Sequence, residues 1–234
     1  MIELRRPEGG RLLRVGHRGA AALAPENSLA SLELAVALGC DLVELDVIQL
    51  DGRLVLAHST AEATADPAPL DDALALLAQS DAGAHVDLKM PGTEGATAEA
   101  LRRHGLVERA VVSSFRPASL RALRAQEPGL RLGLTYPNDR YDLRRHRLLG
   151  PFLTAGLAAM RTVLPARIGR MLGSAQATAG MLNHRVVSRA AVERCHALGV
   201  PVLAWAVETG DEVRRLDELG VDGVIADDPR LIEG

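Results

Sequence analysis

The sequence predicts a parallel α/β fold, a closed (β/α)8 barrel of the TIM-barrel type that forms one domain over residues 1–234. Short apolar runs alternate with helical patterns, and there are eight such runs along the chain. Hydrophobic residues make up 47% of the chain but aromatic residues only 2%. A core of Ala, Leu and Val suits helices packed on a parallel sheet. A doubly wound open sheet is the alternative for this pattern.

The expected strands are short apolar runs, because strands of a parallel barrel are covered on both faces. Many of these runs end in polar residues, and active groups of parallel barrels lie where strands end and loops begin. The runs are Leu13–His17, Leu42–Ile48, His85–Leu88, Ala110–Phe115, Leu130–Thr135, Gly180–Asn183, Val200–Val207 and Asp222–Ala226.

The expected helices lie between these runs and act as crossovers between parallel strands. The first follows Asn27-Ser28, a pair of residue types that cap helices. The expected helices are Leu29–Leu38, Leu70–Leu77, Thr93–His104, Pro117–Gln126, Val187–Leu198 and Asp211–Leu219.

Two segments depart from the regular spacing. In Gln49–Ala57, the pair Asp51-Gly52 predicts a tight turn and a small β-hairpin after the second strand, which returns His58 to the barrel mouth. Tyr141–Gly173 contains six arginines among Leu, Ala and Met. It is interpreted either as one or two outer helices with a basic solvated face, or as a surface that contacts an anionic membrane.

Composition limits the partners and the location of the chain. A net charge of -3 argues against nucleic acid as the main partner. Cys40 and Cys195 are far apart and are expected to be buried. The segment Met1–Arg14 lacks the apolar core of a signal peptide, and no apolar run reaches the length of a membrane span. We therefore expect a cytoplasmic protein.

The candidate metal ligands are three carboxylates on neighbouring expected strands. Glu44 and Asp46 occupy alternate positions of one apolar run, so both project to the same side. Asp87 and Lys89, the only lysine of the chain, repeat this spacing on the next run. Carboxylates and water are the ligands of a hard cation, Mg²⁺ or Ca²⁺, rather than zinc.

The remaining polar residues predict phosphoryl transfer. Arg18 and Lys89 would bind an anionic group, arginine as a planar fork and lysine as a point charge. His17 and His58 can give or take a proton near neutral pH, so that one activates the nucleophile and the other protonates the leaving oxygen.

These residues resemble the glycerophosphodiester phosphodiesterase family, and the resemblance covers nearly the whole chain. It implies metal-dependent hydrolysis of glycerophosphodiesters, small-molecule substrates, to sn-glycerol 3-phosphate and an alcohol in lipid metabolism. By position, His17 and His58 match the catalytic histidines; Glu44, Asp46 and Asp87 match metal ligands; Arg18 and Lys89 match phosphate contacts. The motifs are His17-Arg18-Gly19, Pro25-Glu26-Asn27-Ser28, Glu44-Leu45-Asp46, Asp51-Gly52, His58, Asp87-Leu88-Lys89, Ser114-Phe115, Trp205 and Gly220-Val221-Asp222-Gly223-Val224-Ile225-Ala226-Asp227-Asp228-Pro229.

The chain departs from the family pattern in three places. Ser59 stands where the family usually has aspartate, Asp87 where it has glutamate, and the segment after His58 is short. An open pocket leaves room for a bulkier substrate such as a lysophospholipid, and Trp205 is a candidate substrate contact at the mouth. A phosphate-binding barrel without catalytic activity is the third hypothesis.

Overall fold

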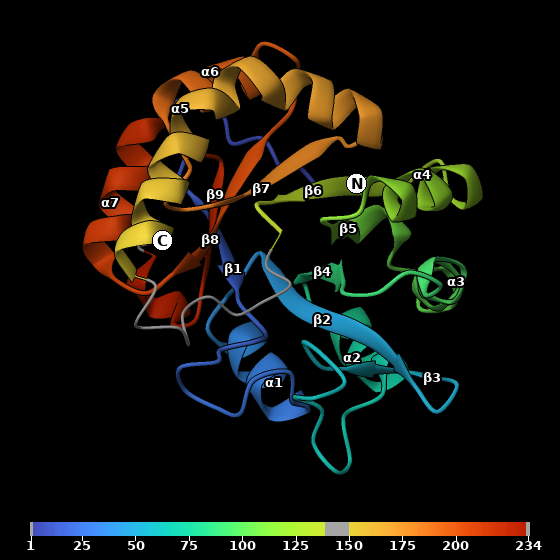
Figure 1. Cartoon of the computed structure of the whole chain (residues 1–234). Helices are drawn as coiled ribbons and strands as arrows, with labels where there is room; N and C mark the ends of the chain where they lie inside the picture. The colour runs from blue at the N-terminus through green and yellow to red at the C-terminus, as the bar shows by residue number, and fades with distance from the viewer. Residues whose placement is uncertain (1, 139–149, 233–234) are drawn as a thin grey trace.

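The computed structural model describes residues 2–138 and 150–232 and contains a closed barrel of eight parallel strands (Figure 1). The strands follow one another around the barrel in chain order, and pairing of the first strand with both the second and the last closes it. The predicted TIM barrel is therefore confirmed. The barrel strands are β1 (Leu13–Gly16), β2 (Leu42–Leu50), β4 (Gly83–Leu88), β5 (Ala110–Ser114), β6 (Arg131–Tyr136), β7 (Ala179–Asn183), β8 (Val202–Val207) and β9 (Gly223–Ala226).

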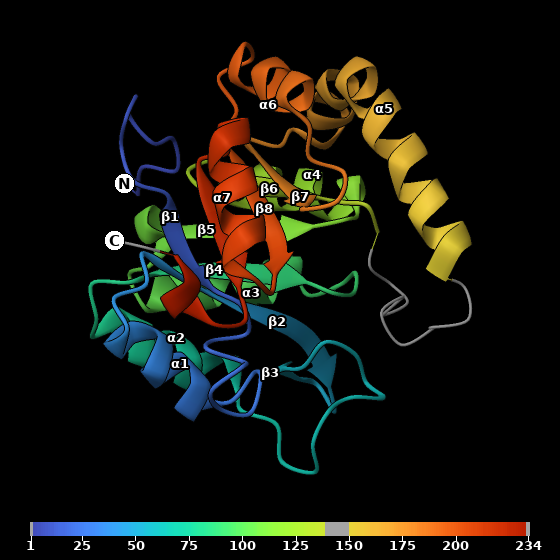
Figure 2. The ribbon, with the colours of Figure 1, turned by 90° about the vertical axis from the view of Figure 1, so that its left-hand side faces the viewer.

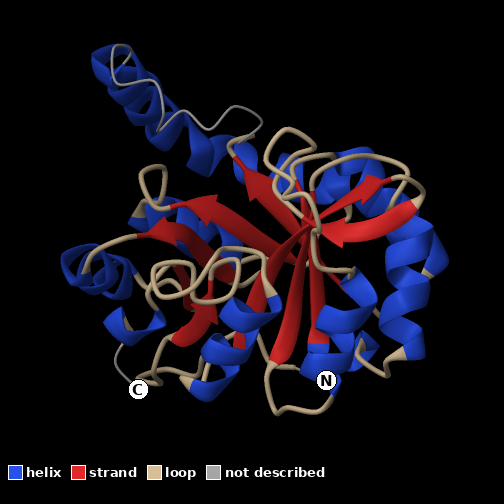
Figure 3. Cartoon of the chain, turned by 90° about the horizontal axis from the view of Figure 1, so that it is seen from below, coloured by secondary structure: helices blue, strands red, loops and turns tan. Residues whose placement is uncertain are grey.

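Helices surround the strands on the outside (Figure 3). Ser28, Ser188 and Thr209 cap three of them by accepting a backbone hydrogen bond in the first turn. The helices are α1 (Leu29–Ala37), α2 (Leu70–Ala78), α3 (Glu94–Arg103), α4 (Pro117–Gln126), α5 (Gly150–Ala175), α6 (Arg189–His196) and α7 (Gly210–Leu219), with short 3-10 turns η1 (Val107–Arg109) and η4 (Pro229–Leu231).

The predicted hairpin forms as an extension of the second barrel strand. Strand β3 (Arg53–Leu56) pairs antiparallel with the end of β2, with Leu50 opposite Arg53. The turn residues Asp51 and Gly52 have φ angles of 49° and 78°. Two successive left-handed residues give the turn type whose twist matches a two-stranded ribbon, and this turn brings the chain back to the barrel mouth at His58.

The barrel interior is apolar at one end and polar at the other. Val15, Leu42, Val111 and Ile225 alternate with outward-facing residues and form a buried interior cluster. Leu4, in the segment before β1, is 1% exposed and belongs to the same cluster. The N-terminal segment thus closes the end of the barrel opposite the hairpin (Figure 2), and the carboxyl ends of the strands remain for the polar residues.

Helix α5 covers most of the arginine-rich segment, in agreement with the expected one or two outer helices. It is one helix of 26 residues, whereas residues 139–149 lie outside the described part of the chain. Leu164, Ile168 and Leu172 are buried, but the turns before them, from 154 to 163, are exposed except for half-buried Leu157. The first half of α5 therefore projects beyond the barrel (Figure 2). Among the described residues, no helix is long and apolar enough to cross a membrane.

Candidate active site

The three predicted ligands meet at the carboxyl end of the barrel. Glu44, Asp46 and Asp87 are buried, and one carboxylate oxygen from each lies within 4.8 Å of the others. Strands β2 and β4 are adjacent, with Asp46 directly opposite Asp87. Strand alternation and this register together place all three carboxylates in the interior.

Asp46 is held from three directions. Asn27 donates from its amide to Oδ2 at 3.2 Å and accepts the backbone N–H of Asp46 at 3.0 Å. Lys89 Nζ lies 2.8 Å from Oδ1, and Arg18 Nε lies 2.9 Å from Oδ2. Burial alone would raise the pKa of Asp46, but the charges of Lys89 and Arg18 hold it well below its usual range. Asp46 is therefore ionised at neutral pH.

Asp87 is oriented by a chain of hydrogen bonds across β4, β5 and β6. Ser113 and Thr135 both donate to its Oδ1, Thr135 at 3.2 Å, while Lys89 Nζ contacts Oδ2 at 2.5 Å. Because Ser113 uses its only proton on Asp87, it accepts from His85 Nε2 at 2.9 Å. Buried His85 is therefore a neutral Nε2–H tautomer, and burial lowers its pKa to about 4.

The charges of this cluster balance while Glu44 is protonated and leave an excess negative charge when Glu44 ionises. Burial, and then the neighbouring Asp46 charge, raise the pKa of Glu44 well above its ordinary value. The carboxylates of Asp46 and Asp87 balance the charges of Lys89 and Arg18, so an ionised Glu44 adds one uncompensated negative charge. A divalent cation beside the three carboxylates would let Glu44 ionise. The donor set fits Mg²⁺ or Ca²⁺.

The loop after β1 is shaped by close packing against helix α1. Gly19 has a φ of 86°, and a Cβ there would lie 2.5 Å from the backbone of Ser31. Arg18 and Asn27 also have positive φ angles, 48° and 55°. Non-glycine residues in this region are strained and persist where the surroundings hold them. Here the constraint aims the Arg18 backbone N–H at Glu44, 2.7 Å away.

His17 is paired with a carboxylate that follows the last strand. It follows β1, Asp227 follows β9, and the parallel pairing of Gly16 with Ala226 places the two residues side by side. His17 Nδ1 contacts Asp227 Oδ1, and the His17 side chain is 10% exposed. A carboxylate on Nδ1 fixes the tautomer in which Nε2 carries the lone pair.

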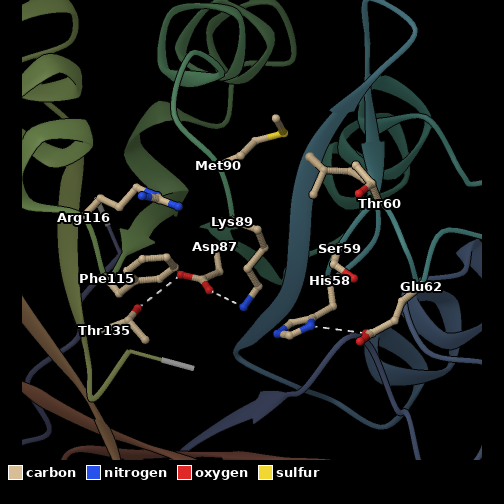
Figure 4. A pocket seen from close by; sticks show the side chains of 11 residues that line it. His58, Ser59, Thr60, Glu62, Asp87, Lys89, Met90, Phe115, Arg116 and Thr135 are labelled. Atoms are coloured by element: carbon tan, nitrogen blue, oxygen red, sulfur yellow. Dashed lines mark hydrogen bonds and ion pairs between the residues drawn. The ribbon is translucent and has the colours of Figure 1, made fainter. Parts of the chain in front are cut away.

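His58 follows β3 and forms a similar pair on the other side of the acidic cluster. Its Nδ1 lies 3.2 Å from Glu62 Oε2. In Figure 4 this pair stands at one side of the cavity, and Asp87 and Lys89 lie opposite it. His58, Asp87 and Lys89 line the same cavity, so the imidazole and the acidic cluster are close in space.

Two cavities open at the strand ends and share Asp87, Lys89 and Thr135. The larger has a volume of about 320 Å³ and is also lined by His58 and Arg116 (Figure 4). The smaller, about 30 Å³, reaches into the barrel. Its other lining residues are His17, Glu44, His85, Ser113, Met181, Trp205 and Ile225.

The structure brings the predicted catalytic, ligand and phosphate-binding residues together. Trp205, the predicted substrate contact, lines the smaller cavity inside the barrel, and its Nε1 donates to the carbonyl of Met181 at 3.0 Å. Of the residues that hold the site, Ser113, Thr135 and Asp227 lie at or near the ends of expected strands, and Asn27 lies in the expected helix-capping pair. Glu62 carries no such signal, and the contacts of all five residues are created only by the fold.

The chain is similar to known proteins in its sequence and in its fold. The model of the glycerophosphoryl diester phosphodiesterase family matches residues 17–75 and 82–231. A glycerophosphodiester phosphodiesterase of Caldanaerobacter subterraneus subsp. tengcongensis is 25% identical, and the alignment covers 94% of this chain and 96% of that protein.

Solved structures share the fold. A phosphodiesterase of Oleispira antarctica, in complex with the product sn-glycerol-3-phosphate, superposes with a TM-score of 0.72 at 22% identity, covering 93% of this chain and 94% of that one. A glycerophosphodiester phosphodiesterase of Agrobacterium tumefaciens gives 0.67 at 21% identity, covering 93% and 97%.

Proposed function

Because the chain belongs to the glycerophosphoryl diester phosphodiesterase family, we propose that it hydrolyses glycerophosphodiesters to sn-glycerol 3-phosphate and an alcohol in lipid metabolism. The observation that carries the proposal is the placement of two carboxylate-paired histidines, His17 and His58, around one buried acidic cluster. The product bound in the Oleispira antarctica structure supports the same substrate class. The cytoplasmic location stays a prediction.

A divalent cation is the cofactor that the acidic cluster would hold. Glu44, Asp46 and Asp87 would bind it, and Ser113 with Thr135 would fix the orientation of the Asp87 carboxylate. When bound, such a cation stabilises the charge that develops on the phosphoryl oxygens.

The two histidines would move the protons. Hydrolysis forms one P–O bond to the attacking oxygen and breaks the P–O bond to the departing alcohol. Nε2 of one imidazole would take the proton of the attacking hydroxyl, and the other, protonated at Nε2, would give its proton to the leaving oxygen. Asp227 and Glu62, each on Nδ1, would stabilise the imidazolium that forms at His17 or His58.

The phosphate group would be held by Arg18 and Lys89. Arg18 is fixed by Glu26, 2.8 Å from Nη1, and by Asp46. The opposing charges of Asp46 and Asp87 outweigh the effect of burial and raise the pKa of Lys89 above its usual value, so it stays cationic. Both side chains would add charge stabilisation in a water-poor site.

The direct test is hydrolysis of glycerophosphocholine with Mg²⁺ or Ca²⁺. His17→Ala should lower kcat by about 100- to 10,000-fold, and removal of divalent ions with a chelator should abolish turnover. His104→Ala, which alters a histidine paired with Asp71 on the outer helices, is the matched control and should leave kcat unchanged. Equal activity in the wild type and His17→Ala would reject the proposed role of His17.

A second candidate substrate class is lysophospholipids at an anionic membrane surface, and helix α5 is the observation that favours it. The helix has three arginines and no acidic residue. Its projecting half exposes Met160 at 37% and Val163 at 44%. Apolar side chains beside arginines suit the interface of an anionic bilayer.

Vesicle sedimentation separates the two candidates. Binding to vesicles of phosphatidylglycerol and phosphatidylcholine should be strong at about 0.05 M salt and weak at about 0.5 M. Met160→Asp with Val163→Asp should abolish it. Leu198→Asp, at a residue that is 45% exposed outside the projecting half of α5, is the control. Absence of binding at both salt concentrations would leave the soluble diesters as the substrate class.

A further inference from the structure

We infer that Glu62 is a positioning residue for His58, supplying the carboxylate that position 59 lacks in this chain. The inference deepens the proposed function and rests on it for its kinetic consequences. Its structural basis is the pair His58 Nδ1 and Glu62 Oε2, 3.2 Å apart at the wall of the larger cavity (Figure 4).

A tight turn after β3 creates this pair. The carbonyl of Ser59 accepts the backbone N–H of Glu62 at 3.2 Å and that of Ala63 at 3.1 Å. These two bonds fold the chain back on itself, so that Glu62 returns to the histidine four residues before it. The start of the segment is fixed as well, because the N–H of Ala57 donates to the carbonyl of Asp46 at 3.1 Å. His58 is therefore anchored to the strand that carries two of the proposed ligands.

The two side chains are too buried to form a solvated surface ion pair, and their burial suits a contact that orients the imidazole. The His58 side chain is 8% exposed and that of Glu62 is 25% exposed. A carboxylate in this position accepts Nδ1–H and leaves the proton-transferring lone pair on Nε2, the ring nitrogen on the cavity side in Figure 4. Ser59 also lines the cavity, but its side chain carries no charge.

His17 provides an internal comparison within the same site. Its Nδ1 contacts Asp227, which directly follows β9 near the far end of the sequence. The two histidines therefore share one arrangement, a carboxylate on Nδ1, although the carboxylates come from unrelated parts of the fold. Two unrelated parts of the fold each place a carboxylate on the Nδ1 of a histidine, which indicates that the orientation of both imidazoles matters for the reaction. At His58, Glu62 is the residue that fixes this orientation.

Enzyme kinetics test whether Glu62 acts through His58. Glu62→Ala should lower kcat by about 10- to 100-fold with little change in KM, since orienting partners of histidines have effects of this size. Glu62→Gln, which keeps a neutral acceptor oxygen, should lose less. Asp66→Asn, at an exposed acid of the same segment, is the matched control and should match the wild type.

A double-mutant cycle distinguishes positioning from general damage. In the His58→Ala background, Glu62→Ala should change the residual kcat by less than about twofold, because the group that it orients is gone. The same loss in both backgrounds would overturn the inference. Full activity of His58→Ala would instead reject the role of His58 in the proposed function, so the two failures are distinguishable.

Nitrogen-15 NMR of the imidazole tests the contact without any turnover. At about pH 8, where a free imidazole is neutral, His58 should carry its proton on Nδ1 in the wild type. Glu62→Ala should shift it to the Nε2–H form, whereas Asp66→Asn should not. An unchanged tautomer in Glu62→Ala would show that Glu62 does not orient the ring.

Discussion

Replacement of His85 by Gln should remove most of the loss in the free energy of unfolding that this residue causes at acidic pH. His85 is buried beside Asp87, and its Nε2–H donates to Ser113. Its Nδ1 has no hydrogen-bond partner among the described residues. Protonation at Nδ1 would place an unsatisfied N–H and a charge in the barrel interior, which explains why burial lowers the pKa to about 4.

The size of the effect follows from linkage. The unfolded chain takes up a proton at His85 near pH 6.5, whereas the folded chain does so only near pH 4. Between these values the unfolded state binds more protons, so stability is fully present above pH 6.5 and falls as the pH is lowered. At about 1.4 kcal/mol for each pKa unit, the loss is about 2 kcal/mol at pH 5 and about 3 kcal/mol at pH 4.

Urea unfolding followed by circular dichroism measures this loss. The free energy of unfolding of the wild type and of His85→Gln should be compared at pH 7, 6, 5 and 4, because other titrating groups contribute to both proteins. The difference between the two should shift by about 3 kcal/mol in favour of the variant from pH 7 to pH 4. Parallel curves would refute the reasoning, since they would mean that His85 titrates alike in both states.

Three further predictions concern metal binding, the N-terminal segment that closes one end of the barrel, and the loop after β1. Asp87→Asn should weaken binding of Mg²⁺ or Ca²⁺ at least about tenfold by calorimetric titration; unchanged affinity would remove Asp87 from the ligand set. Leu4→Ala should lower the free energy of unfolding by about 2–5 kcal/mol, against about 0.5 kcal/mol or less for exposed Leu198→Ala. Asn27→Ala should cost about 1–3 kcal/mol, because it leaves the backbone N–H of Asp46 without its acceptor; a neutral result would show that the contact is dispensable.

The fold and the central residues of the site could be predicted from the sequence because both depend on local geometry. Alternation along a strand brings Glu44 and Asp46 to one side, and the same spacing at Asp87 and Lys89 gives the second half of the cluster. The turn at Asp51-Gly52 defines the hairpin by backbone conformation alone. For the arginine-rich segment, composition indicated a helix but gave neither its length nor the projection of its first half.

The contacts that orient these residues were decided by the tertiary structure. His17 meets Asp227 because closure of the barrel pairs the first strand with the last, and no periodicity in the sequence shows that contact. His85 reaches Asp87 through Ser113 because adjacent strands pair in one register. Residue types and their spacing along the chain show which groups can do chemistry. Barrel closure decided the ionisation of the buried groups, because burial and nearby charge exist only in the folded chain. Barrel closure placed Asp227 beside His17, and the turn after β3 placed Glu62 beside His58.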